Sequence, residues 1–145
     1  MKLVIQRVKK ASVKVKKDDE VVGRIGVGLF ILVGFGMEDT KEDVEKMVKK
    51  VLNLRVMVDS EGKMNLSIMD TSKEILVVSQ FTLYADTEKG NRPSFIKAAE
   101  PGLARDLYRL FVMGLTQEGV KVETGKFGEY MEIDVQLDGP VTIEI

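Results

Sequence analysis

The sequence predicts a single α+β domain, in which a curved or barrel-like, mostly antiparallel sheet carries two main helices packed to one side. Strand patterns outnumber helical ones, because only two segments repeat apolar residues at helical spacing. The strand patterns follow one another as in hairpins instead of alternating with helices, which favours this class over a parallel α/β fold. No linker or internal repeat interrupts the 145 residues, so we expect one domain over 1–145.

Four strands are predicted in the first part of the chain. β-Forming residues alternate with polar ones over 2–8 and 11–16, and the pattern resumes over 21–25 after a polar turn at 17–20. Residues 28–35 form a continuous apolar run, which is typical of a strand buried on both faces.

Two helices follow from local signals. The first is expected to begin after Thr40, because Thr40 and Asp43 have the spacing of a capping box. Its apolar residues at helical spacing are Val44, Met47, Val48, Val51 and Leu52. The second is expected to begin near Pro101, since proline suits the first turn of a helix. Its apolar stripe is Leu103, Leu107, Leu110 and Phe111.

The remaining strands are predicted by short apolar runs between turn residues. A turn at 59–62 separates the first two of these runs. The predicted strands are 54–58, 74–83, 120–123, 131–137 and 141–145.

The composition excludes several kinds of chemistry. The chain has no cysteine and no histidine, so it has no disulfide, no thiolate metal site and no Ser-His or Cys-His catalytic pair. We expect neither a metal nor a cofactor. The start of the chain lacks the apolar core of a signal peptide, and the longest apolar run is too short to span a bilayer, so we expect a cytoplasmic protein with no membrane partner.

Charge gives only a weak indication of a nucleic-acid partner. The net charge is −1, which does not draw the whole protein onto nucleic acid. Lysines cluster within 9–17 and 46–50, but such clusters are more often solvated surface than binding sites.

Three further segments are candidates for a functional site, because they carry polar or turn residues that the fold alone does not require. Residues 79–84, Ser-Gln-Phe-Thr-Leu-Tyr, bring polar side chains to the end of an apolar strand. Residues 89–94 form a turn-rich basic loop whose Lys89 and Arg92 could contact phosphates. Residues 138–142 contain a Gly-Pro pair before the last strand, which is usually a plain turn. For each segment alone, the structural interpretation is favoured.

Taken together, five segments resemble the D-aminoacyl-tRNA deacylase family, and they occur in that family's order. They are the opening strand through Gln6-Arg7-Val8, Ser79-Gln80-Phe81-Thr82-Leu83, Gly90-Asn91-Arg92-Pro93-Ser94-Phe95, Thr124-Gly125-Lys126-Phe127-Gly128 and Gly139-Pro140-Val141-Thr142. The resemblance covers essentially the whole chain. One departure is Leu137, where the family usually has an asparagine, so a polar contact from that side chain is not expected.

The resemblance implies a role for each matching residue. The floor of an ester-binding pocket would consist of Ser79, Gln80, Phe81 and Thr82. Gly139 and Pro140 would form a cis pair that enters the partner subunit's pocket in a homodimer and rejects L-aminoacyl groups, with Arg7 holding the pair in place. Phe127 and Met131 would lie where the terminal adenosine of the tRNA binds.

The activity so implied is hydrolysis of D-aminoacyl-tRNA, and of mischarged glycyl-tRNA, at the 3′ end. Either Thr82 attacks the ester, or water attacks with help from the free ribose hydroxyl while backbone N–H groups near Phe81 and Thr82 stabilise the oxyanion. The second route is favoured, because the sequence offers no base near Thr82. A non-catalytic RNA-binding module and a Thr-dependent hydrolase of small esters or amides are the competing interpretations.

Overall fold

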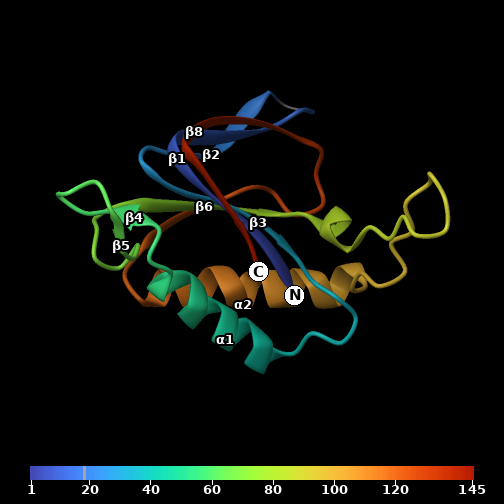
Figure 1. Ribbon diagram of the computed structural model, residues 1–145. Helices are drawn as coiled ribbons and strands as arrows, with labels where there is room; N and C mark the ends of the chain where they lie inside the picture. Colours follow the sequence, from blue (N-terminus) through green and yellow to red (C-terminus); the bar gives the residue numbers. More distant parts are fainter. Residues whose placement is uncertain (18) are drawn as a thin grey trace.

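The computed structural model describes residues 1–17 and 19–145, and within them two α-helices lie on one side of a strongly curved sheet (Figure 1). The helices are α1 (Lys41–Asn53) and α2 (Pro101–Gln117), and a short 3-10 helix, η1 (Phe81–Tyr84), follows β6. The strands are β1 (Lys2–Val15), β2 (Glu20–Ile25), β3 (Gly28–Gly34), β4 (Met57–Val58), β5 (Met64–Leu66), β6 (Glu74–Ser79), β7 (Lys121–Thr124) and β8 (Met131–Glu144). Neither described helix is long and apolar enough to cross a membrane.

The main sheet is mixed: most of its pairings are antiparallel, as predicted, but two are parallel. Its order is β2-β1-β3-β6-β7, with β8 also paired to β1. The pairings of β1 with β2, β3 and β8 are antiparallel, whereas β3–β6 and β6–β7 are parallel. The parallel half arises because α1 lies between β3 and β6, and α2 between β6 and β7, so that each crossover returns the chain in the same direction.

Two long strands replace four predicted short ones. The segments 2–8 and 11–16 form the single strand β1, which pairs first with β3 and then, from Ala11, with β2. The segments 131–137 and 141–145 likewise form the single strand β8, which follows β1 through two register shifts. Bulges bend a strand without ending it, and this bending lets β1 and β8 wrap round together. Asp18, in the predicted turn at 17–20, lies outside the described residues.

The curvature nearly closes the sheet into a barrel. β2 crosses β7 so closely that a Cβ on Gly23 would come 2.7 Å from the Thr124 carbonyl oxygen. One apolar cluster, which includes Val13, Phe30 and Leu76, fills the inside of this curve. A larger cluster lies on the other face, between the sheet and the two helices. The position of both helices on one side, as predicted, follows from this second core (Figure 1).

The predicted helix starts are confirmed. Thr40 is the N-cap of α1, and its side chain and that of Asp43 form the reciprocal pair of a capping box. Pro101 is the first residue of α2. The predicted stripe of α2 is only partly right, since Leu107 and Phe111 are buried but Leu103 is 40% exposed.

Two strand predictions are too long. The segment 54–58 contributes only β4, which pairs with the unpredicted β5 in a separate two-stranded sheet. The segment 74–83 ends as a strand at Ser79, and the apolar residues after it form η1 instead. An apolar run alone does not distinguish a strand from the start of a tight helical turn.

Candidate active site

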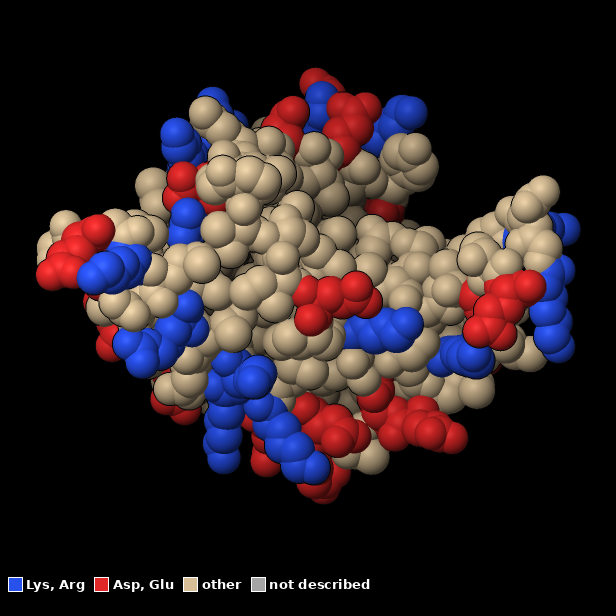
Figure 2. All heavy atoms as spheres, viewed as in Figure 1, with Lys and Arg blue, Asp and Glu red and all other residues tan. Residues whose placement is uncertain are grey.

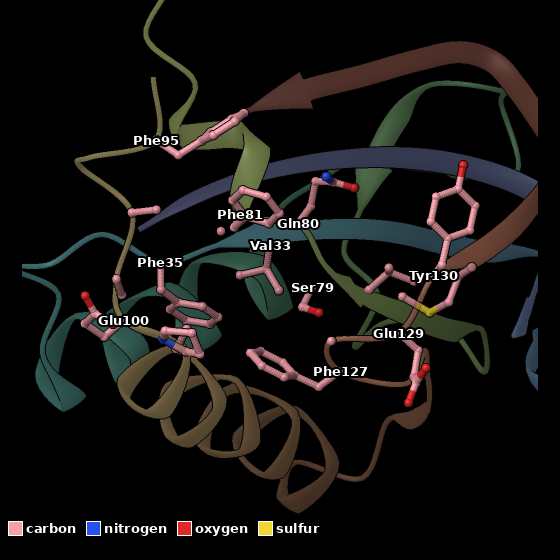
Figure 3. Close-up of a pocket in the computed structure, with 18 of the residues that line it drawn as sticks. Val33, Phe35, Ser79, Gln80, Phe81, Phe95, Glu100, Phe127, Glu129 and Tyr130 are labelled. Atoms are coloured by element: carbon pink, nitrogen blue, oxygen red, sulfur yellow. The ribbon is translucent and has the colours of Figure 1, made fainter. Parts of the chain in front are cut away.

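A cavity of about 690 Å³ opens where β3 and β6 end beside the start of α2 (Figure 3). Its volume falls in the range of about 300–1,000 Å³ usual for small-molecule sites. The residues that line it come from the segments 33–35, 78–81, 95–104 and 127–133. The cavity therefore lies at the carboxyl ends of the two neighbouring parallel strands, a common place for a site in sheets of this kind.

Three of the four residues predicted to form the pocket floor line this cavity: Ser79, Gln80 and Phe81. Ser79 is the last residue of β6 and pairs with Val33 in the parallel ladder. The Gln80 N–H then donates to the Val33 carbonyl at 2.7 Å, and the chain turns into η1. The end of the ladder thus brings a hydroxyl, an amide and an aromatic ring to one cavity (Figure 3).

Thr82, the fourth residue, is placed differently. It lies in η1 with an exposed side chain and does not line the cavity. Its Oγ1 accepts a hydrogen bond from Gln80 Nε2. Thr82 therefore contacts a floor residue, Gln80, without lining the cavity itself.

The backbone at the start of η1 offers two hydrogen-bond donors. The N–H groups of Phe81 and Thr82 belong to the first turn of the 3-10 helix, where no earlier carbonyl of the helix can accept from them. Neither donates to any described residue. Two neighbouring free N–H groups can together stabilise a negatively charged oxygen.

Phe127 and Met131 also line the cavity, and Phe127 lies on the side away from η1 (Figure 3). The Phe127 ring packs against Tyr108 of α2, with 5.7 Å between ring centroids, and the Arg105 guanidinium lies 5.5 Å from its centroid. Met131 Sδ accepts a hydrogen bond from the Lys126 N–H at 3.3 Å. Phe127 and Met131 thus give the cavity an aromatic ring and a thioether, which suit a flat, apolar group such as a base.

The lining residues that were not predicted include Phe95, Glu100, Glu129 and Tyr130. They come from segments without a regular pattern, so only their place in the fold brings them to the cavity (Figure 3). The Phe95 ring lies edge-on to Phe81, with 4.9 Å between centroids. Glu100 and Glu129 are both exposed, and they put two carboxylates beside an otherwise mostly apolar cavity.

Gly139 and Pro140 lie in a different part of the molecule. The peptide bond between them is cis, both residues are exposed, and neither lines the cavity of its own chain. Arg7 lies beside them, since a Cβ on Gly139 would come 3.4 Å from Arg7 Nη2. Arg7 is buried, and its Nη1 donates to the Val56 carbonyl at 2.9 Å. Its Nε lies 3.0 Å from Asp138 Oδ2 as an ion pair, without the alignment of a hydrogen bond.

Two tyrosines next to the segment that forms the floor, Tyr84 of η1 and Tyr108 of α2, have raised pKa values. Burial raises the pKa of Tyr108, whose hydroxyl donates to the Val77 carbonyl at 2.9 Å. Burial, followed by the nearby Asp39 carboxylate, raises the pKa of Tyr84 to about 12. Neither phenol can therefore act as a base near neutral pH. The described residues contain no cluster of three acidic side chains close enough to hold a metal ion.

The sequence profile of the D-Tyr-tRNA(Tyr) deacylase family matches residues 4–145 of the chain. The chain belongs to this family. Curated D-aminoacyl-tRNA deacylases of Limosilactobacillus reuteri (strain DSM 20016) and of Clostridium perfringens (strain 13 / Type A) are each 53% identical to it over 143 residues. The alignments cover 99% of this chain and 97% and 95% of those two proteins. The resemblance inferred from the motifs is thus confirmed, and the chain is a hydrolase of the deacylase class.

Two solved structures share the fold. A protein described as a c-Myc DNA unwinding element binding protein superposes with a TM-score of 0.92 at 45% identity, covering 100% of this chain and 97% of its own. A probable eukaryotic D-amino acid tRNA deacylase superposes with a TM-score of 0.85 at 19% identity, covering 99% and 98% of the two chains. The second likeness supports the architecture alone.

Proposed function

We propose that the chain hydrolyses the ester bond between a D-amino acid and the 3′ end of a tRNA, releasing the D-amino acid and free tRNA. The observation that carries the proposal is one cavity, in a member of the deacylase family, that joins Ser79, Gln80 and Phe81 to Phe127 and Met131. Its volume of about 690 Å³ is large enough for an aminoacyl group together with a nucleoside.

The two sides of the cavity suit the two parts of this substrate. The adenosine would bind beside Phe127 and Met131, where an aromatic ring and a sulfur atom offer apolar contact. The ester would then lie on the floor at the end of β6. The amide of Gln80 and the hydroxyl of Ser79 provide hydrogen bonds that orient it.

The reaction in this proposal is direct attack by water. The free ribose hydroxyl next to the ester helps to activate the water, and the N–H groups of Phe81 and Thr82 stabilise the oxyanion that forms on the carbonyl oxygen. One such donor is worth roughly 3–4 kcal/mol of transition-state stabilisation in other enzymes. Thr82 is not the nucleophile, because its exposed hydroxyl contacts Gln80 and no described base.

Selection against L-amino acids is assigned to Gly139 and Pro140 of a second copy of the chain. Both residues are exposed and stand away from their own cavity, so they are free to enter another. Gly139 has a φ of +125°, and its missing side chain allows its carbonyl to approach a ligand closely. Backbone atoms at this position would clash with the side chain of an L-amino acid, whatever that side chain is, and leave room for the D-amino acid. Glycine has no side chain to clash, so glycyl-tRNA would also be a substrate.

The remaining parts of the proposal follow from this one. The protein acts as a homodimer on the 3′ end of aminoacyl-tRNA, and it uses neither a metal nor a cofactor. A translation-editing role of this kind places it in the cytoplasm.

A comparison of three substrates tests the proposal. The protein is incubated with D-tyrosyl-tRNA, with D-tyrosine methyl ester and with uncharged tRNA, and release of tyrosine and binding are measured. We expect rapid hydrolysis of the tRNA ester and little of the methyl ester, which lacks the adenosine. Equal rates on both esters would indicate a small-ester hydrolase instead, and tRNA binding without hydrolysis would indicate an RNA-binding module.

A further inference from the structure

The chain between η1 and α2 forms a loop that projects from the rest of the molecule (Figure 1). Asp86 and Ser94 close its foot with two backbone hydrogen bonds, each 2.8 Å long. The Asp86 carboxylate also accepts from Lys97 Nζ at 3.0 Å, which raises the pKa of Lys97. The tip that this foot closes off, residues 87–93, is therefore held as one unit.

The foot of the loop is fixed to the wall of the cavity. Phe95, which directly follows Ser94, lies edge-on to Phe81 at 4.9 Å between centroids, and both rings line the cavity. The Ala98 backbone also forms a bridge with Gly36, just after β3. The tip therefore stands at a defined position beside the mouth of the site.

The tip carries basic side chains that have no partner within the described protein. Its sequence, Thr-Glu-Lys-Gly-Asn-Arg-Pro, holds no large apolar residue that could bury it. Lys89 and Arg92 are exposed, and neither forms an ion pair with a described carboxylate, whereas Lys97 at the foot is paired. With Glu88 the tip keeps a net charge of +1, although the whole chain carries −1. Figure 2 shows basic side chains on this projecting part of the surface.

We infer that this tip binds backbone phosphates of the single-stranded 3′ end of the tRNA whose ester occupies the cavity. The inference rests on the proposed function and extends it from the ester to the nucleotides before it. A tip of seven residues folded on itself reaches about 10 Å from its foot, at about 3.3 Å per residue, which is the scale of a few nucleotides. Lys and Arg contacts to phosphate position a nucleic acid without reading its sequence, so the loop would serve many tRNAs.

The salt dependence of binding tests this inference. The double variant Lys89→Gln/Arg92→Gln is compared with the wild type for binding of uncharged tRNA between 0.03 M and 0.3 M salt. Two lost phosphate contacts should make the slope of log affinity against log salt shallower by about 1.4. The ratio of wild-type to variant affinity for tRNA should therefore fall about 25-fold between the lowest and the highest salt concentration. Hydrolysis of a short substrate, the D-tyrosyl ester of adenosine, should be unchanged.

The matched control is Lys49→Gln/Lys50→Gln, which removes the same charge from an exposed part of α1 away from this cavity. It should bind tRNA with the wild-type slope. An unchanged slope in the loop variant, or an equal slope loss in the control, would overturn the inference. The binding measurement needs no turnover, so it tests the role of the loop even if the wild type hydrolyses neither ester. Absence of hydrolysis would refute the deacylase proposal and not the binding role of the loop.

Discussion

Arg7 and Asp138 form an ion pair, 3.0 Å from Nε to Oδ2, that joins β1 to the part of β8 that carries Gly139. The guanidinium also donates to the Val56 carbonyl at 2.9 Å. Arg7 is only 8% exposed, so its charge is held by these two partners more than by water. The buried Arg7 side chain thus contacts the residue before Gly139, while Gly139 and Pro140 themselves remain exposed.

Replacing Arg7 with Met should loosen this support. The change keeps an unbranched apolar stem but leaves the Val56 carbonyl without its donor, and Asp138 without its cation. Lost buried hydrogen bonds cost about 1–3 kcal/mol each, so the free energy of unfolding should fall by an amount of this order. The ratio of D- to L-tyrosyl-tRNA hydrolysis should fall as well, because the wall is less firmly placed.

Denaturant unfolding and the two deacylation rates measure these effects. The control is Arg24→Met, which removes an exposed arginine of β2 that forms no ion pair with a described residue. An Arg7→Met variant that is less stable but keeps full chiral selectivity would show that Arg7 has a structural role alone.

Mixed dimers test whether the site is completed by a second chain. At Gly139 a Cβ would come 2.8 Å from Val141 Cγ2 at a φ of +125°, so Gly139→Ala should disturb the wall. Gln80→Ala should disturb the floor. Each variant alone should be impaired, but a hybrid of the two contains one site with both parts intact. Random pairing makes half of the dimers hybrid, so about a quarter of wild-type activity should return.

The two variants are co-expressed with different affinity tags. The unseparated mixture should show the quarter of wild-type activity, and hybrids purified through both tags should show about half, since one of their two sites is intact. Activity that stays at the level of the parent variants would show that wall and floor act within one chain, contrary to the proposal.

Thr82→Ala should keep substantial activity. Thr82 is exposed, contacts Gln80 and does not line the cavity, so its loss removes an orienting contact. Such a contact is worth about 1–3 kcal/mol, or roughly 5- to 150-fold in kcat/KM, whereas loss of a nucleophile removes several more orders of magnitude. Single-turnover kinetics give the rate. Mass spectrometry of the wild type during turnover provides the check, since an acyl group on Thr82 would prove the other mechanism.

Features encoded by neighbouring residues could be predicted from the sequence. The capping box of Thr40 and Asp43, and the start of α2 at Pro101, depend on a few adjacent positions, and both are found as expected. The continuity of β1 and β8 could not be predicted, because it depends on the pairing of two segments more than 100 residues apart. The strand end at Ser79 likewise depends on Val33, whose carbonyl accepts from Gln80.

The candidate site was predicted through family resemblance more than through local pattern. Ser79, Gln80 and Phe81 line one cavity with Phe127 and Met131. Thr82 does not line it, because η1 turns its side chain to the surface. Two of the additional lining residues, Phe95 and Glu129, lie in irregular segments whose position only the complete fold determines.

The ion pair of Glu74 with Lys121 should make stability depend on pH. The Lys121 ammonium, and then the Gly26 N–H at 2.7 Å, lower the pKa of Glu74 in the folded state. A lowered folded-state pKa adds stability above the unfolded pKa of about 4.3, and this stability is lost as the pH falls through the folded value. Glu74→Gln should therefore be less stable than the wild type at pH 7, and the difference should vanish in acid.

Unfolding free energies at pH 7, 5 and 3 provide the measurement. Glu45→Gln is the control, because Glu45 is exposed on α1 and forms no ion pair with a described residue. A Glu74→Gln difference that stays constant down to pH 3 would exclude the ion pair as its cause.

The most direct test of the account compares D-tyrosyl-tRNA with L-tyrosyl-tRNA prepared on the same tRNA. Release of labelled tyrosine is followed at equal concentrations of enzyme and substrate. The proposed cavity and backbone wall predict rapid loss of D-tyrosine, while L-tyrosyl-tRNA decays no faster than without protein. Equal rates on the two esters, or no hydrolysis of either, would contradict the account.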